Sequence, residues 1–273
     1  DGRVLFIGVE ERVIDDTANG GPSIWRVWGD TLDVLDLDTR EWKQAWSTFD
    51  AFDPFPRVPD RWRHLDRVEA DMPSIWEWTH ANAIYFGRRG NLLLSFRHLD
   101  QVISLSPGFE TVEWRLGGPD SSFTFPDPAD QFYGQHTASE LPNGNILLFD
   151  NGNFRPEGPY SRALELELDF GTMTARKVWE YRPQADVYAH RLSSATRLPN
   201  GNTLVNFGFR GDGPDQPPVI VEARPDGTAA WELTPRLPGV RTVSYRAYPW
   251  PTLGGELQVE PTGLTGLAAV GGR

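Results

Sequence analysis

Two histidines stand at matching places in a repeated sequence pattern. His136 lies eight residues before Gly144 and His80 lies ten residues before Gly90, and each glycine belongs to a turn that also contains asparagine. If both histidines fall on the first strand of a β unit, their imidazoles converge, as a nucleophile and a general acid or base must. Arg97 ends the strand that follows Gly90. Its guanidinium could turn back to the same site and hold an oxyanion through paired hydrogen bonds.

A structural role is the alternative for each of these residues, because buried histidines are commonly satisfied hydrogen-bonding groups. His190 is a weaker candidate, since it lacks the residues that accompany the other two. We expect His64 and His98 on the surface. Asn151, in the segment 149–153, belongs either to a plain turn or to a loop that places its amide near the pocket.

The turn that positions these residues is repeated along the chain. Residues 141–145 (Leu-Pro-Asn-Gly-Asn) recur at 198–202, and a weaker copy occupies 88–93. The turn glycines at 90, 144 and 201 are 54 and 57 residues apart, near the length of a four-stranded β-propeller blade with longer loops. Apolar residues alternate along 163–168, which favours a strand, and helical periodicity is nearly absent. We expect two-residue Asn-Gly turns, since Asn and Gly accept positive φ.

The sequence thus predicts an all-β protein, with a single β-propeller domain over residues 1–250 and a C-terminal extension over 251–273. About four blades are visible, together with a closing strand at 242–248, and the first blade is already under way at residue 1. Residues 49–73 suit a long loop that either borders a site or simply joins two blades. The last strand of each blade carries a tryptophan: Trp46, Trp114, Trp179 and Trp231.

Composition excludes several function classes. A net charge of −12 argues against binding nucleic acid or an anionic membrane, because both require a basic surface. Cysteine is absent from the sequence, and there is no His-x-x-x-His pair, Asp-rich calcium loop or Gly-rich phosphate loop. We therefore expect no metal site and chemistry without a cofactor. No apolar run approaches the roughly 20 residues that span a bilayer.

Several runs together resemble the bacterial arylsulfotransferase family, which are aryl-sulfate sulfotransferases that do not use a nucleotide sulfate donor. The resemblance covers roughly residues 76–250, and the runs follow the family's order. It is carried by Trp78-Thr79-His80-Ala81-Asn82-Ala83-Ile84, residues 90–97 and 114–118, Gln135-His136-Thr137-Ala138, and residues 147–152, 161–163 and 244–247.

The resemblance implies a six-bladed propeller that takes a sulfuryl group from a phenolic sulfate ester onto a histidine and passes it to another phenol. His136 matches the transiently sulfated histidine. His80 and Asn82 match residues that bind the sulfate or protonate the leaving phenolate, and Arg97 matches the arginine that stabilises sulfate charge. Gln135 and Thr137 flank His136 in its motif, and with Asn151 we expect them to contact substrate.

The chain departs from the family pattern in two ways. Family members carry another pocket histidine in an earlier blade, and no residue before His80 matches it. About four blades are visible instead of six, which indicates either a domain that is incomplete at its N-terminus or a smaller closed propeller.

The resemblance leaves more than one activity open. Besides sulfuryl transfer between an aryl sulfate and a phenol, the same pocket could bind anionic or aromatic ligands without turnover, or let water replace the acceptor and act as a sulfate-ester hydrolase. By analogy the protein is periplasmic or secreted, although the sequence shows no signal peptide. Donor, acceptor and oligomeric state are left open.

Overall fold

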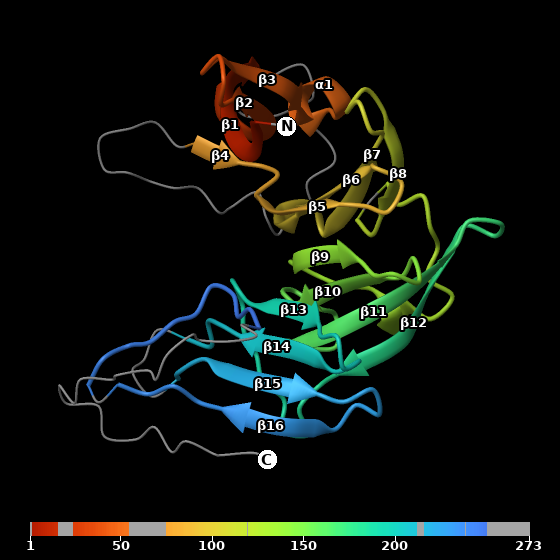
Figure 1. The fold of residues 1–273 in the computed structure, drawn as a ribbon, viewed down its shortest axis with the longest axis vertical. Helices are drawn as coiled ribbons and strands as arrows, with labels where there is room; N and C mark the ends of the chain where they lie inside the picture. The colour runs from red at the N-terminus through yellow and green to blue at the C-terminus, as the bar shows by residue number, and fades with distance from the viewer. Residues whose placement is uncertain are drawn as a thin grey trace.

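The structure is a computed structural model and describes residues 2–15, 24–54, 75–118, 120–211, 216–237 and 239–249. It is an all-β fold of the β-propeller type, and Figure 1 shows its four-stranded sheets following one another from the red N-terminal sheet to the blue C-terminal one. The first sheet, blade 1, contains β1 (Arg3–Asp15), β2 (Ile24–Asp36), β3 (Trp42–Ser47) and β4 (Ile75–Glu77). The other three sheets are antiparallel meanders that run through consecutive strands.

Blade 2 contains β5 (Ala81–Phe86), β6 (Leu92–Phe96), β7 (Gln101–Leu105) and β8 (Val112–Leu116). Blade 3 contains β9 (His136–Glu140), β10 (Ile146–Asp150), β11 (Arg162–Asp169) and β12 (Thr174–Tyr181). Blade 4 contains β13 (Ser194–Arg197), β14 (Thr203–Phe207), β15 (Val219–Ala223) and β16 (Ala229–Leu233). Short helical turns are α1 (Thr48–Ala51), η3 (Arg97–Leu99) and η4 (Pro128–Asp130).

Blade 1 is less regular than the others. Its strand β2 pairs with β1 along its whole length, and on its other side with β3 antiparallel and with β4 parallel. The four tryptophans expected on closing strands lie on β3, β8, β12 and β16. In blade 1, however, β4 completes the sheet after the tryptophan strand.

The second strands of blades 2, 3 and 4 are buried on both faces. Along β6, Leu92, Leu94 and Phe96 face the core that blade 2 shares with blade 1, whereas Leu93 faces the core shared with blade 3. Because successive side chains of a strand point to opposite faces, a continuous apolar run can fill two cores at once. The β10 strand does the same between blades 2 and 4. This sandwiching explains the short, fully apolar runs in the sequence.

The repeated turns have one geometry, but it is not the expected two-residue turn. The amide of Leu141 donates to Asn145 O, and the amide of Gly144 donates to Leu141 O, so the loop consists of residues 142–144. Gly144 has φ 91°, and Gly201 and Gly90 have φ 85° and 78° in loops with the same hydrogen bonds. In such a three-residue loop only the final residue needs positive φ, which glycine adopts without strain.

Three further expectations concern the closing strand at 242–248, the loop at 49–73 and the C-terminal extension at 251–273. Residues 242–248 do not form the expected closing strand, because their only bonds to another backbone in the described chain are isolated ones, to Gly208 and Ser193. Of the expected loop 49–73, residues 49–51 belong to α1 and Phe52 is buried, while 55–73 lie outside the described residues. The extension 251–273 also lies outside them, so the domain boundary at 250 stays a prediction.

Candidate active site

Strand pairing brings the candidate residues to one end of the blades. His80 directly precedes β5, and Arg97 directly follows β6, whose Phe96 pairs with Ala81. In the same way His136 begins β9 and pairs with Phe149 near the end of β10, so Asn151 emerges beside it. The first strands β5 and β9 lie against one another. The four residues therefore lie at one edge, where the sequence predicts the two histidines and Arg97 and leaves Asn151 open.

The starts of the first strands have an unusual backbone. His80 has φ 53° and Thr137 has φ 55°, both in the left-handed region, and Ser193 just before β13 has φ 88°. Each of β5 and β9 also shifts register against its partner, between Ala81 and Ala83 in blade 2 and next to Thr137 in blade 3. Left-handed non-glycine residues cost of order 1–3 kcal/mol and concentrate where side chains must be aimed. These bulges redirect the side chains at the top of the first strands.

The ring of His136 is held in one tautomer. Its Nδ1 lies 2.7 Å from Asn151 Oδ1, while Asn151 Nδ2 donates to Ala189 O at 2.6 Å and to Leu192 O at 3.2 Å. Because the amide nitrogen is directed at two carbonyls, the oxygen must accept from His136, so Nδ1 carries the proton. Among the described residues no hydrogen bond reaches His136 Nε2. Its lone pair is therefore available for attack.

The His136 ring is also held neutral. Burial is the largest cause that lowers its pKa, to about 3, and the positive charge of Arg97 adds to this. His80 and Arg246 lower the pKa of His136 further, and the hydrogen bond to Asn151 opposes them. An imidazole that stays unprotonated across the ordinary pH range keeps its nucleophilic lone pair.

Arg97 lies in η3 and is buried. Its Nη2 donates to His190 O at 2.9 Å, and its Nη1 lies 3.2 Å from His98 Nε2. Burial is the largest cause that lowers the pKa of Arg97, to about 10, so it remains a cation. A charged guanidinium close to His136 suits the negative charge of a transferring group.

His80 is half-exposed and lies beside acidic groups. Its Nδ1 is 3.0 Å from Glu77 Oε2. Beneath it, the buried carboxylate of Asp30 accepts from the Thr79 hydroxyl and, at 2.7 Å, from the amide of Ala81. Burial raises the pKa of Asp30 to about 6. Blade 1 thus holds the residues on both sides of His80 and places carboxylates beside it.

Besides Asn151, three residues were expected to bind substrate, and the structure places them in different settings. Asn82 is buried, its Nδ2 donates to Gln135 O at 2.7 Å, and its Oδ1 has no hydrogen-bond partner. Gln135 donates from Nε2 to Ser95 Oγ, Phe96 O and Gln101 O, so its amide joins blade 3 to blade 2. Thr137 lines a cavity, and its hydroxyl accepts from the amide of Ala195 at 3.2 Å.

The expectation that His98 lies on the surface is wrong. His98 is 2% exposed, and its ring stacks on that of His80 with centroids 4.7 Å apart. The turn η3 folds back through a left-handed Asp100, which drives His98 under β4, where Nδ1 lies 2.8 Å from Glu77 O. Burial lowers the pKa of His98 to about 3. His190 packs on Phe209, and His64 lies outside the described residues.

Three side chains form a group that sequence patterns did not indicate. Ligand atoms of Glu77, His80 and His98 lie within 4.8 Å of one another, as a metal ion would require. The Nε2 atom of His98, however, faces the Arg97 guanidinium, which would repel a cation. The prediction of a site without metal stays a prediction, and we assign no metal to this group.

Arg246 also belongs to the site, although we did not single it out from the sequence. Its Nη2 donates to Asn82 O at 2.5 Å, and its charge acts on His136. The only signal for it was the run 244–247 within the family resemblance. Arg246 and Tyr248 help to line a cavity of about 520 Å³ on the first strands, together with residues 83–85, 137–142 and 194–199.

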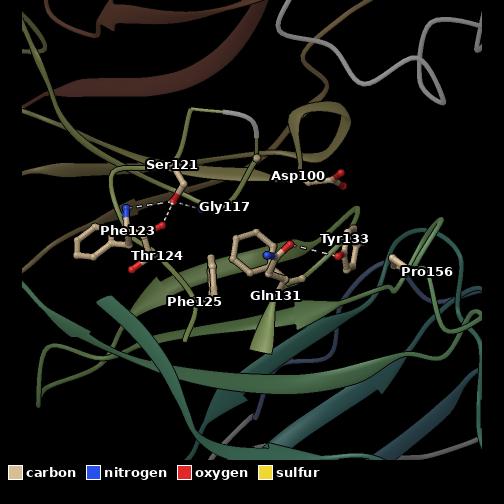
Figure 2. Close-up of a pocket in the computed structure, with 11 residues that line it drawn as sticks. Asp100, Gly117, Ser121, Phe123, Thr124, Phe125, Gln131, Tyr133 and Pro156 are labelled. Carbon is tan, nitrogen blue, oxygen red and sulfur yellow. Dashed lines mark hydrogen bonds between the residues drawn. The ribbon is translucent and has the colours of Figure 1, made fainter. Parts of the chain in front are cut away.

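A second cavity of about 520 Å³ lies between blades 2 and 3. Figure 2 shows Phe123 and Phe125 at one part of it and Tyr133, beside Gln131, at another. Asp100, also labelled there, accepts from the amide of Gly134 at 2.6 Å, two residues before His136. The cavity is aromatic, and its polar end adjoins the backbone that carries His136.

Among the described residues, no helix has the length and apolarity needed to cross a membrane.

Comparison with known proteins identifies the family. The curated arylsulfate sulfotransferase AssT of Escherichia coli O6:H1 is 27% identical over 164 residues, which cover 48% of this chain and 27% of that protein. The chain thus spans about a quarter of the length of the curated relative it matches. Among solved structures, a streptogramin B lyase is 12% identical with a TM-score of 0.38, and the match covers 85% of this chain and 59% of that one. The virginiamycin B lyase from Staphylococcus aureus is 10% identical with a TM-score of 0.38, and the match covers 86% of this chain and 61% of that one. Both are too distant to carry an argument. The family model described as Arylsulfotransferase (ASST) matches residues 1–234, and the chain therefore belongs to the arylsulfotransferase family.

Proposed function

We propose that this protein transfers a sulfuryl group from an aryl sulfate ester to a phenolic acceptor through a sulfated His136. The observation that carries the proposal is the bond between His136 Nδ1 and Asn151 Oδ1. With Asn151 Nδ2 donating to two carbonyls, this bond leaves the lone pair on Nε2, the atom that would attack sulfur. Membership of the arylsulfotransferase family supplies the substrate class.

The first half-reaction moves the sulfuryl group to the enzyme. Nε2 of His136 donates its lone pair to sulfur, and the sulfur–oxygen bond to the phenol breaks with its electron pair on the phenolate. Protonated His80 gives its proton to that oxygen, helped by Glu77 at 3.0 Å. Arg97 stabilises the charge on the sulfuryl oxygens, as positively charged groups do in phosphoryl transfer.

The second half-reaction returns the enzyme to its starting state. The acceptor phenol gives its proton to neutral His80, its oxygen attacks sulfur, and the nitrogen–sulfur bond breaks with its pair on Nε2. In the sulfated intermediate the His136 ring is cationic, so the bond from Nδ1–H to Asn151 becomes stronger. Asn151 is a positioning residue in this scheme, whereas the unpartnered Oδ1 of buried Asn82 is free for a substrate or water hydrogen. The family resemblance also predicts export to the periplasm or beyond.

The test is turnover of 4-nitrophenyl sulfate with and without an added phenol. Transfer predicts nitrophenol release that rises with acceptor, together with a sulfated acceptor; release that ignores the acceptor indicates a hydrolase. Binding without turnover indicates a ligand-binding module. His136→Ala should abolish transfer, whereas His190→Ala, a change of a ring that packs on Phe209, should retain most of it. Full transfer by the His136→Ala protein would disprove the assignment of the nucleophile.

A further inference from the structure

The segment 244–248 carries an arginine into the site from the far end of the described chain. It is held against blade 4 by hydrogen bonds that include Ser193 N to Tyr245 O, Ser244 N to Gly208 O, and Ala247 N to Ser194 Oγ. These bonds fix the backbone on both sides of Arg246. The backbone position of Arg246 is therefore set by its neighbours' contacts with blade 4 and the residues beside it.

The contacts of Arg246 leave its charge unbalanced. Nη2 donates to Asn82 O at 2.5 Å, Nη1 lies 3.3 Å from the Tyr248 hydroxyl, and the guanidinium lies over the Tyr245 ring. Its Nε is buried and has no hydrogen-bond partner. Among the described residues no carboxylate pairs with it, since each of these partners is neutral.

A second arginine of the same cavity shows the contrast. Arg197 lies 2.5 Å from Glu165 Oε2, so its charge is neutralised within the protein. A charged group that is partly removed from water is stabilised by such a partner. Arg246 is partly buried, its Nε is buried without a partner, and the residue lacks a carboxylate, which fits a residue whose counter-charge arrives with a ligand.

The connection to His136 passes through one residue. Asn82 accepts from Arg246 through its backbone oxygen and donates from Nδ2 to Gln135 O, the residue before His136. The positive charge of Arg246 is among the causes that lower the pKa of His136. Arg246 and Thr137, the residue after His136, line the same cavity.

We propose that Arg246 is a second anion-binding residue of the site, which with Arg97 holds the sulfonate oxygens of the aryl sulfate. This inference rests on the proposed function for the identity of the anion. Arg97 comes from blade 2 and Arg246 from the segment after blade 4, so the two cations reach the anion from separate elements. A guanidinium also offers paired donors, which match two oxygens of one sulfonate group.

The experiment measures binding of inorganic sulfate to the whole protein by calorimetry, and KM for 4-nitrophenyl sulfate. Arg246→Gln should weaken sulfate binding about ten- to a hundredfold, the range for a lost charge-assisted hydrogen bond. Arg246→Lys should be intermediate, because it keeps the charge but loses the paired donors. Arg241→Gln is the control, since Arg241 lies three residues before this segment, over the Phe209 ring, and does not line the cavity.

The outcomes separate the two proposals. If the wild type turns over no aryl sulfate but binds sulfate in a way that Arg246→Gln weakens, the transfer proposal fails and the anion site stands. Sulfate binding by Arg246→Gln at wild-type strength overturns the inference, as does a wild type that binds no sulfate at millimolar concentration. If thermal melting shows that Arg246→Gln is unfolded, Arg246→Lys becomes the test of the inference. Unchanged sulfate binding and KM in Arg246→Lys would contradict the role of the paired guanidinium donors.

Discussion

Replacing Asn151 tests whether His136 depends on its orienting amide. In the resting site the Nδ1–H bond joins neutral groups and is worth about 0.5–1.5 kcal/mol, whereas in the cationic sulfated state it is worth about 1.5–3 kcal/mol. The difference, about 1–1.5 kcal/mol, corresponds to roughly five- to tenfold in rate. Loss of the fixed tautomer adds about twofold, because the proton then divides between two nitrogens. We expect Asn151→Ala to lower kcat by about ten- to twentyfold.

The assay is steady-state transfer from 4-nitrophenyl sulfate, combined with 15N NMR of the His136 ring to show which nitrogen is protonated. Asn151→Ala also leaves Ala189 O and Leu192 O without their donor, which costs about 1–3 kcal/mol of stability, so kcat is measured well below the melting temperature. Asn153→Ala is the matched control, since Asn153 donates to Tyr188 and His190 and not to His136.

Two results would refute this reasoning about Asn151. One is a folded Asn151→Ala protein with wild-type kcat. The other is a wild-type NMR spectrum in which Nε2 carries the proton. Equal losses in the Asn151 and Asn153 variants would show instead that the loop matters only for folding.

Two further predictions concern stability. Burial raises the pKa of Asp30 from 3.8 to about 6, so its folded form holds a proton that the unfolded chain has released, and ionisation of this group costs stability as pH rises through that window. The stability of Asp30→Asn relative to wild type, measured by urea unfolding, should therefore increase by about 2 kcal/mol between pH 4 and pH 6.5 and then level off. A difference that stays flat across this range would contradict the raised pKa of Asp30. Gly152→Ala should prevent folding or cost several kcal/mol of stability, because a Cβ there would lie 1.9 Å from Tyr160 O in a residue with φ 74°. Gly158→Ala is the control, since Gly158 has φ 106° and no atom within 4 Å of a Cβ added there, so this change adds only backbone strain. Equal melting temperatures for the two variants would contradict the packing argument.

Local sequence signals predicted the features that depend on one hairpin. The spacing between each histidine and its turn glycine fixes where the first strand starts, and antiparallel pairing then fixes where the second strand ends. This is why His80, Arg97 and His136 could be brought to one edge before the structure was known, whereas the position of Asn151 was left open. The turn type was missed, because Asn-Gly occurs both in two-residue loops and as the last part of a three-residue loop that begins with proline.

Features that depend on distant chain segments were not predictable in this way. From the sequence His98 was expected on the surface, where it stands between the charged residues Arg97 and Asp100. In the structure the left-handed Asp100 ends the turn η3, and His98 lies under β4. Arg246 lies 164 residues from Asn82, whose backbone oxygen accepts from it. No periodicity or spacing rule links residues so far apart, and only the packing of blades brings them together.

Each central residue of the site is fixed by a neighbouring structural unit. Asp30 of blade 1 accepts from the Thr79 hydroxyl and the Ala81 amide, on either side of His80 at the start of blade 2. Carbonyls that precede blade 4 direct the amide of Asn151, which in turn orients His136. The groups that orient His80 and His136 thus belong to neighbouring units. Loosening one interface between blades should therefore change the orientation of the histidine before the blade that carries it unfolds. The tautomer of His136 is thus a property of the junction between blades 3 and 4, and it would be lost if that junction opened while β9 and β10 stayed paired.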